Sequence, residues 1–251
     1  MGIRSVSEHA PGTPVTGCFS CYLSATCLPQ GLTPEESAQL EAIIPPSLKL
    51  EKGHALMVQN SAFKSLYAVR SGSLKQVTTT ESEESLVTAL YLPGDMVGFD
   101  AIGTDTCPGD VIALETTTVC EYPYERLDGL CNGIPTLRRR LQRNLSQAMH
   151  EERLRLHLLL SRKAEVRLAC FLLVISERFR RRGYSSRHFR LAFSRGDIGN
   201  YLGLTYETVG RTLAAFQAQN LLTVRGREYR LLDLAQLARL ADSTGRRQRR
   251  A

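Results

Sequence analysis

Three cysteines close to the N-terminus, Cys18, Cys21 and Cys27, are spaced like the ligands of a metal ion or an iron–sulfur cluster. A zinc site and a [4Fe-4S] cluster each take four ligands, so one more residue must complete either centre. The gap of five residues between Cys21 and Cys27 is longer than the gaps of two to four that are typical of zinc fingers. The spacing therefore favours an iron–sulfur cluster, with zinc as the alternative.

The fourth ligand must come from another part of the chain, and the spacing leaves three cysteines open. Cys107 precedes a proline, as the last ligand does in bacterial ferredoxins. Cys120 lies in a strand-like run, where a rigid scaffold could hold a ligand, and Cys131 is the third candidate. Cys170 occurs in an apolar, helix-like stretch and is expected to be a core thiol.

A second kind of chemistry is indicated by residues 194–218, which have the pattern of a helix-turn-helix. Gly203 suits the tight turn between two helices, and Thr205 is a favourable N-cap for the second one. One face of the second helix should pack in the core, because apolar residues recur there at steps of four and three: Val209, Leu213 and Phe216. The segment therefore predicts a DNA-reading helix.

The opposite face of that helix would meet base edges in the major groove at and just after the helix start. Arg211 can donate to guanine O6 and N7, and Glu207, one turn earlier, can accept from cytosine N4. A hairpin around Gly226 would form a wing whose arginines suit phosphate contacts. The predicted DNA-contacting residues are Tyr206, Glu207, Thr208, Gly210 and Arg211.

The charge of the chain is divided unevenly between its two halves. Residues 1–135 carry 7 Lys and Arg against 16 Asp and Glu, whereas residues 136–251 carry 25 against 9. The net charges are therefore −9 and +16, which together give the +7 of the whole chain. A basic C-terminal half is expected of a protein that binds a polyanion. Its run at 178–182 is either a solvated helix end or an edge that faces phosphate.

The elements that must position these groups change along the chain. Residues 48–124 contain short strand-like runs separated by turn signals, which predicts an antiparallel barrel or jelly roll. Residues 135–161 are compatible with one long helix that carries a heptad seam, so we expect a two-chain coiled coil, the alternative being a face packed on the chain's own barrel. The seam consists of Leu145, Met149, Glu152, Leu156 and Leu159.

The predicted fold class is α+β, with an antiparallel barrel or jelly roll that the family resemblance described below identifies as a β-roll like that of cyclic-nucleotide-binding domains. We expect a flexible N-terminus with the cysteine segment over 1–32, the sensory β-roll over 33–134, the dimerisation helix over 135–162, the winged helix-turn-helix over 163–241, and a basic disordered tail over 242–251.

The compartment and the protein class follow from what the sequence lacks. It has no secretory signal and no apolar run near the roughly 20 residues that span a bilayer, so we expect a cytoplasmic protein with no membrane partner. In that compartment its seven cysteines would stay reduced. The chain has no second cluster motif, no Rossmann or P-loop glycine pattern and no nucleophile elbow. These absences argue against an enzyme and against an iron–sulfur electron carrier, which is the alternative from a different class.

The chain resembles the FNR-type regulators (fumarate and nitrate reduction) of the CRP/FNR superfamily, from Cys18 to about Ala241. The most specific stretches are KSLYAVRSG at 64–72, PGDMVGFDAIG at 93–103, ALET at 113–116 and RGDIGNYLGLT at 195–205. The resemblance implies a sensory β-roll, a long dimerisation helix and a C-terminal winged helix-turn-helix. It also implies an oxygen-labile [4Fe-4S] cluster, with ligands that match Cys18, Cys21, Cys27 and Cys120 by position.

The mechanism implied by the resemblance is a switch between dimer and monomer. With the cluster intact, a homodimer would bind an inverted repeat with a GA core and contact RNA polymerase as an activator of anaerobic genes. Oxygen would convert the cluster to a [2Fe-2S] form and separate the dimer. Two Glu152 side chains would meet across the seam and oppose association, and we expect the cluster to offset that cost. The alternative within the family is a regulator that responds to heme or to a small molecule.

Two positions depart from patterns in this superfamily. Gly210 stands where FNR-type proteins usually have a serine that helps to read the outer thymine of the half-site, and Tyr206 stands where cyclic-AMP receptors have an arginine. The segment 98–100 also lacks the glutamate that those receptors use on ribose, and no Arg-Ser or Arg-Thr pair occurs at 110–113. We therefore expect a GA core read by Glu207 and Arg211, and no binding of cyclic nucleotides.

Overall fold

The computed structural model describes residues 17–160 and 163–242, in two compact units that meet between Ala148 and Met149. The predicted N-terminal segment before Gly17 and the basic tail after Asp242 lie outside the described residues. Within the described ranges, no helix combines the length and the apolar character needed to cross a membrane.

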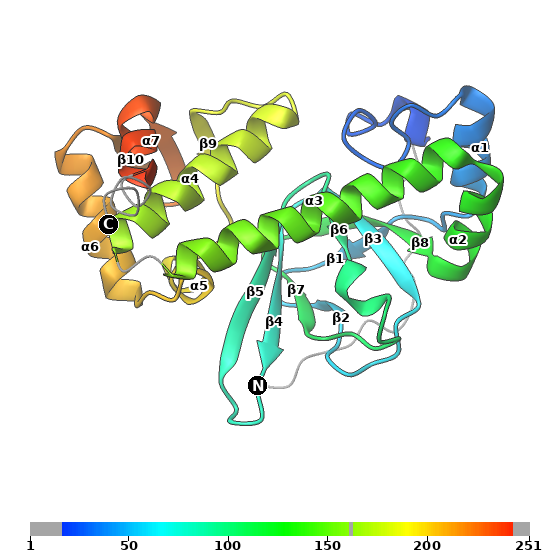
Figure 1. Cartoon of the computed structure of the whole chain (residues 1–251), viewed down its shortest axis with the longest axis horizontal. Coiled ribbons are helices and arrows are strands. Elements are labelled where there is room, and N and C mark those ends of the chain that lie inside the picture. Colours follow the sequence, from blue (N-terminus) through cyan, green and yellow to red (C-terminus); the bar gives the residue numbers. More distant parts are fainter. Residues whose placement is uncertain (1–16, 161–162, 243–251) are drawn as a thin grey trace, which may run out of the picture. The chain divides into compact units, whose positions relative to one another are not determined.

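The first unit is built on two four-stranded antiparallel sheets (Figure 1). One has the strand order β1–β8–β3–β6 and the other the order β2–β7–β4–β5. The strands are β1 (Leu48–Leu50), β2 (Ala55–Met57), β3 (Ser65–Ser71), β4 (Leu74–Thr79), β5 (Ser85–Tyr91), β6 (Met96–Val97), β7 (Asp110–Ala113) and β8 (Thr117–Pro123). This arrangement confirms the predicted β-roll.

The β-roll encloses its own apolar core. Alternate side chains of a strand point to opposite faces, and the burial of the first residues of β4 and of β8 follows that alternation. Both sheets contribute buried residues to this core: Leu50, Val69 and Val119 from one, and Leu74, Val111 and Ala113 from the other. Two facing apolar surfaces therefore hold the sheets together.

Helices that the strand pattern did not predict form a second core in the same unit. They are α1 (Pro34–Ala42) and α2 (Tyr124–Gly133), and they join the first turns of α3 (Pro135–Leu160). α1 begins with a capping box, in which Thr33 and Glu36 each accept a backbone N–H from the other. This second core includes Leu28 of the cysteine segment together with Leu40, Leu66, Leu127 and Leu137. The cysteine segment is therefore packed into the unit.

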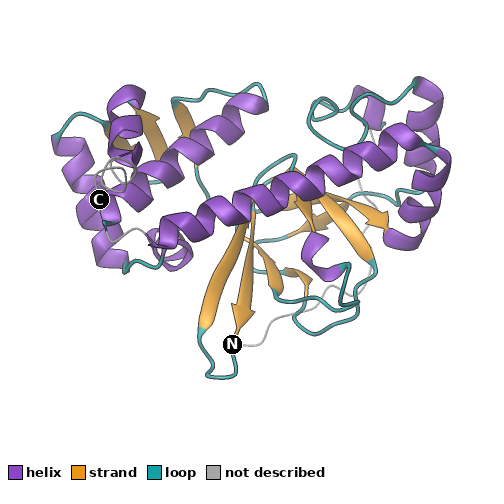
Figure 2. Cartoon of the chain, in the orientation of Figure 1, coloured by secondary structure: helices purple, strands orange, loops and turns teal. Residues whose placement is uncertain are grey.

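The second unit is mainly helical (Figure 2). It contains the end of α3 and the helices α4 (Ala164–Arg181), α5 (Arg195–Leu202), α6 (Tyr206–Ala218) and α7 (Leu234–Asp242). A three-stranded antiparallel sheet has the order β10–β11–β9, formed by β10 (Leu222–Arg225), β11 (Glu228–Leu231) and β9 (His188–Arg190). The helix-turn-helix and the wing thus lie at the predicted positions, whereas α7 and β9 are elements that the sequence analysis did not predict.

Candidate functional site

The structure brings four cysteine thiols together in the first unit. Cys18 begins a 3-10 turn (Cys18–Ser20), Cys21 and Cys27 follow in the loop, and Cys120 comes from β8. Burial raises the pKa of the Cys18 thiol to about 12, and the nearby Cys27, Cys120 and Cys21 add to the rise. Burial likewise raises the pKa of Cys120, to which Cys21 contributes. These four thiols are therefore within electrostatic range of one another.

Cys27 is the most buried member of this group. Its thiol lies 3.7 Å from the hydroxyl oxygen of Tyr122, which is 1% exposed on β8. Burial raises the pKa of Cys27 to about 11, although the hydrogen bond from Tyr122 opposes that rise. Burial also raises the pKa of the Tyr122 phenol well above its ordinary value. Both groups therefore keep their protons, and either one can donate in the hydrogen bond between them.

The backbone of the cysteine loop is held by its own turns and by α3. The N–H groups of Thr26 and Cys27 both donate to the Leu23 carbonyl at 2.9 Å. From α3, Arg140 donates through Nε to the Cys27 carbonyl at 3.1 Å and through Nη2 to the Thr26 carbonyl at 2.5 Å. The hydroxyl of Tyr22 donates to the carbonyl of Arg70 on β3.

Sequence reasoning missed Tyr122 and Arg140. Tyr122 could have been found, because it follows Cys120 by two residues and so shares its face of β8. Arg140 has no local signal, since it lies 113 residues from the carbonyl that it binds. Only the packing of α3 against the loop brings these two groups together.

The other three cysteines have different surroundings. Cys107 is buried in the core between the two sheets. Cys131 lies on α2, where burial and Asp128 raise the pKa of its thiol. Cys170 lies on α4, where burial and Asp242 raise the pKa of its thiol. All seven cysteines are free thiols.

The spacing of the four thiols bears on what they could hold. Among residues 17–160 and 163–242, no three His, Cys, Asp or Glu side chains are gathered closely enough to hold one metal ion. A single zinc ion requires its sulfurs at about 2.3 Å from one centre. A four-iron cluster accepts each thiolate on a different iron, so its ligands stay further apart. Four cysteine thiolates form a donor set of structural zinc sites and of four-iron clusters alike, so the residues fit either centre.

The helix-turn-helix begins with well-capped helices. Ser194 and Asp197 form a capping box at the start of α5, with Ser194 Oγ accepting the Asp197 N–H at 3.0 Å. Gly203 ends α5 in the left-handed region, at φ 62°, where glycine is favoured. Thr205 caps α6 by accepting the N–H of Thr208 at 3.2 Å. Both predicted signals are confirmed.

The inner face of α6 packs as predicted. Val209, Leu213 and Phe216 are buried. The two helices approach so closely that a β-carbon at Gly199 would lie 2.7 Å from the carbonyl oxygen of Leu204. Gly199 was not singled out in the sequence, yet it permits this contact.

The outer face of α6 carries the predicted DNA-contacting residues. Tyr206 is 57% exposed, and Glu207 and Arg211 are exposed, whereas Thr208 and Gly210 are half-buried. Arg211 donates to the hydroxyl of Thr208 at 3.4 Å. The backbone N–H at the helix start, the Thr205 hydroxyl and Arg211 lower the pKa of Glu207. Glu207 is therefore an ionised acceptor beside a cationic donor.

Further basic groups lie on α5 and on the wing of the second unit. Arg195 of α5 has its Nη1 3.8 Å from the position that a β-carbon at Gly210 would take. The hairpin of β10 and β11 pairs Arg225 with Glu228 across the turn at Gly226. Arg225, Arg227 and Arg230 of this wing are exposed. The arrangement presents cations to a polyanion next to the outer face of α6.

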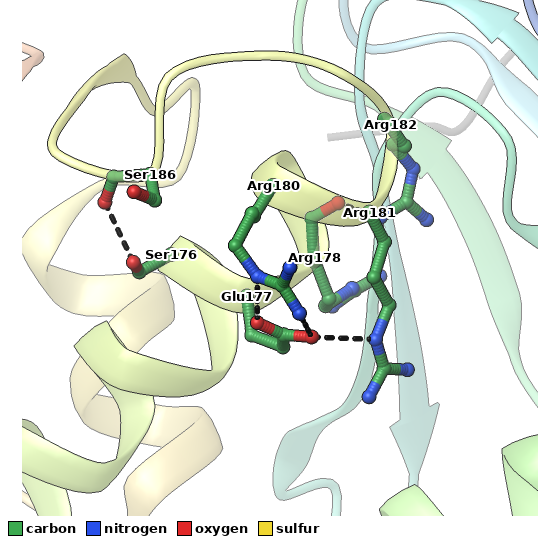
Figure 3. A network of polar contacts seen from close by, with 7 residues as sticks. All are labelled: Ser176, Glu177, Arg178, Arg180, Arg181, Arg182 and Ser186. Carbon is green, nitrogen blue, oxygen red and sulfur yellow. Dashed lines mark hydrogen bonds and ion pairs between the residues drawn. The ribbon is translucent and has the colours of Figure 1, made fainter.

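The basic end of α4 is organised largely within itself (Figure 3). The Glu177 carboxylate accepts from Arg180 Nε at 2.6 Å and from Arg181 Nε at 2.9 Å. These hydrogen bonds lower the pKa of Glu177 to about 2. Arg182 donates to the Arg178 carbonyl at 2.6 Å, which satisfies one carbonyl of the last helical turn. The local contacts favour the interpretation as a helix end.

The seam residues of α3 lie largely uncovered in the single chain. Leu145, Met149 and Leu156 are 37%, 56% and 50% exposed, and Leu159 is half-buried. Glu152 is exposed and accepts from Arg155 Nε at 2.9 and 3.1 Å. The Arg155 guanidinium in turn lies 5.2 Å from the centre of the Tyr201 ring, a cation–π contact.

Comparison with known proteins agrees with both units. Residues 47–133 match the family model of the cyclic nucleotide-binding domain, and residues 166–240 match that of the Crp-like helix-turn-helix domain. The chain is 45% identical over 224 residues to the fumarate and nitrate reduction regulatory protein of Vibrio cholerae, covering 89% of this chain and 90% of that one. It is a member of the CRP/FNR family.

Other relatives place this regulator in the FNR/Anr group. It is 43% identical over 228 residues to the transcriptional activator protein Anr of Pseudomonas aeruginosa, covering 91% of this chain and 93% of that one. It is also 43% identical to the Escherichia coli fumarate and nitrate reduction regulatory protein over 241 residues, which is 96% of each chain. The chain is therefore a DNA-binding transcription activator of FNR/Anr type, and not an enzyme.

The fold of this CRP/FNR regulator is also found among solved structures. FixK2 from Bradyrhizobium japonicum superimposes with a TM-score of 0.70 at 24% identity, covering 79% of this chain and 97% of that one. A CooA variant from Carboxydothermus hydrogenoformans superimposes with a TM-score of 0.65 at 19% identity, covering 80% and 88%. At these identities the likeness concerns the fold alone.

Proposed function

We propose that this regulator senses oxygen through a [4Fe-4S] cluster whose ligands are Cys18, Cys21, Cys27 and Cys120. The observation that carries the proposal is the gathering of four thiols, three from one loop and one from β8, of which Cys18, Cys27 and Cys120 are desolvated by burial. A set of four cysteine thiolates is the usual donor set for such a cluster. When bound, the cluster supplies a centre that is labile to oxygen.

The protein residues would hold and shield this centre. β8 fixes Cys120 on a rigid strand, while Leu23 and Leu28 anchor the loop on either side of Cys27 and exclude water. The Tyr122 hydroxyl would donate a hydrogen bond to the Cys27 sulfur, which is one of the contacts that tune a cluster's potential. Ligation requires the thiols to lose their protons, so a free site with raised pKa values should bind the cluster better as pH rises.

For the output, we propose that α6 enters the major groove of a promoter. Arg211 would donate to guanine, and Glu207, held ionised, would accept from cytosine on the other strand, so the pair would read a GA core. Tyr206, Thr208 and Gly210 would meet the flanking bases or the backbone. The exposed arginines of the wing would contact phosphates without reading sequence.

The active form that we propose is a homodimer joined along α3. Leu145, Met149 and Leu156 form an uncovered apolar stripe, and their heptad spacing suits a second copy of the same helix. A dimer would match the two halves of an inverted repeat. Because Glu152 is paired with Arg155 in its own chain, the charge that two copies would bring together is partly balanced.

At the promoter, we propose that the dimer activates genes for anaerobic growth through contact with RNA polymerase in the cytoplasm. The curated relatives are named for transcriptional activation and for fumarate and nitrate reduction, which supports this role. The acting signal would be loss of the cluster in oxygen and separation of the dimer.

The proposal includes no cyclic nucleotide, although residues 47–133 match that domain family. Two carboxylates of the β-roll are engaged by neighbouring groups. Asp100 accepts from Gln76 Nε2 at 2.7 Å, and Asp110 accepts the N–H of Gln59 at 2.8 Å. The segment around Asp110 offers no arginine for a phosphate. Titration calorimetry with cyclic AMP should show no saturable heat.

The deciding experiment is purification without oxygen, followed by exposure to air. About four irons per chain are expected, with a broad visible band that bleaches in air while dimer and binding to TTGAT-type DNA are lost. A colourless, zinc-containing protein that binds DNA equally well in air would refute oxygen sensing. It would leave the DNA-binding regulator unaffected.

A further inference from the structure

The side chain of Arg140 joins α3 to the backbone of the cysteine loop by hydrogen bonds. Its Nε and Nη2 donate to the carbonyl oxygens of Cys27 and Thr26 at 3.1 and 2.5 Å. The guanidinium is half-buried. Arginine presents its N–H groups in a rigid planar fork, so two donors can meet two consecutive carbonyls at once. This is an ordered contact between two elements that are remote in sequence.

The loop end of the contact has a defined shape. Thr26 and Cys27 both donate to the Leu23 carbonyl, and the Cys27 carbonyl also accepts the N–H of Gln30 at 3.3 Å. Leu23 and Leu28 anchor this turn in the core. The two carbonyls that Arg140 binds therefore have positions that depend on how the loop holds Cys27, the most buried of the four thiols.

The helix end of the contact lies on the face of α3 that packs inward. At about 100° per residue, Arg140 lies about 60° to one side of Leu137 around the helix axis, and Leu141 lies about 40° to the other side. Leu137 is buried, and Leu141 packs against the same core as the cysteine loop. The exposed seam begins with Leu145, one turn after Leu141 and about 140° around the axis from Arg140. Met149 follows Arg140 by nine residues, a rise of about 14 Å, and lies on about the opposite side of the helix. A turn of α3 about its axis would therefore reorient the seam.

We propose that Arg140 is the positioning residue that couples the state of the cysteine loop to the dimerisation face of α3. The inference rests on the proposed cluster and dimer. With the loop in its ligand-bearing form, the fork fixes the rotation and axial position of α3. When the loop changes shape, both hydrogen bonds are lost together, because their acceptors are adjacent carbonyls. α3 then turns, and the seam no longer faces its partner.

The test compares variants for iron content and for dimer association, with the cluster loaded and after its removal. Arg140→Gln should retain iron and visible absorption close to wild type, while dimerisation of the loaded protein weakens about tenfold. The dimer dissociation constants of the loaded and cluster-free forms, measured by sedimentation equilibrium, would then differ much less than they do in wild type. Arg139→Gln makes the same charge change at an exposed neighbour. This variant should keep the wild-type difference in dimerisation between the loaded and cluster-free forms. Arg140→Lys retains the charge without the fork and should be intermediate.

Each other outcome has a distinct meaning. Arg140→Gln with wild-type iron and a wild-type difference in dimerisation would overturn the coupling role. Loss of iron with a lower melting temperature in both the Gln and the Lys variant would mark a purely structural contact and also overturn it. If only the Gln variant loses iron, the Lys variant decides between the outcomes. A weakened response of its dimerisation to the cluster would support the coupling role, and a full response would overturn it. Wild-type protein without iron would instead refute the proposed function.

Discussion

The cysteine site and the DNA-contacting face of α6 are built in opposite ways. The DNA-contacting residues lie within one turn and a half of a single helix, exposed on one side of it, while Val209 and Leu213 hold the other side in the core. The cysteine site joins a loop to a strand almost a hundred residues away, and its thiols are desolvated. A site on one helix face can change its residues one by one, whereas a buried site depends on every segment that encloses it.

The largest expected effect comes from the one thiol outside the loop. Cys120→Ser removes a ligand with almost no change in volume, so we expect iron content to fall close to zero and the visible band to disappear. Cys131→Ser, also buried in this unit, is the matched control and should retain iron. Wild-type iron in Cys120→Ser would break the comparison, because the site would then be local to the loop.

On the exposed side, Arg211→Ala should weaken binding to the inverted repeat by roughly 1–3 kcal/mol per half-site. Unrelated DNA should be affected less, and iron content should not change. The measurement is fluorescence anisotropy at one fixed salt concentration. Arg239→Ala, exposed on α7, is the control. An equal loss on both DNAs would mean that Arg211 contacts phosphate and not a base.

Removing one tyrosine hydroxyl at each site compares how much a buried and an exposed hydroxyl contribute to stability. Tyr122→Phe removes the donor to Cys27, and we expect it to lower the free energy of unfolding of the cluster-free protein by about 0.5–1.5 kcal/mol. In the loaded protein, it should lower the reduction potential. Tyr206→Phe, at a position that is 57% exposed, should stay within about 0.5 kcal/mol of wild type. Urea unfolding measures the free energy of unfolding of both variants. Equal losses would contradict the distinction between a buried and an exposed site.

The smallest effect is expected from Gly210→Ser. A β-carbon there would have Arg195 Nη1 at 3.8 Å as its nearest neighbour, so the side chain fits. Replacing glycine inside a helix should stabilise the fold by about 0.5 kcal/mol. Because FNR-type regulators usually carry serine here, we expect a stronger preference for thymine at the outer position of the half-site. Gly199→Ser, which would meet the Leu204 carbonyl at 2.7 Å, should destabilise the fold. Tolerance of both changes would show that α5 and α6 can separate.

Much of the second unit could be predicted from sequence, because its signals are local. The cap at Thr205, the turn at Gly203 and the apolar steps from Val209 to Phe216 act within one or two helical turns. α1 escaped prediction, although the box of Thr33 and Glu36 is an equally local signal. The prediction assigned residues 33–134 to the β-roll and placed no helix at this position.

In the cysteine site too, the sequence could indicate the residues that are close together in the chain, but not those that come from remote segments. Spacing alone indicated Cys18, Cys21 and Cys27 as ligands and left Cys107, Cys120 and Cys131 open; only the family resemblance pointed to Cys120. The tertiary structure decided that Cys120 lies among the loop thiols, that Tyr122 and Cys27 share a hydrogen bond, and that Arg140 binds the loop carbonyls. The physical reason is that hydrogen bonds and desolvation depend on distance in space. Sequence determines such distances within a helix or a turn, but only packing determines them between a loop, a strand and a helix.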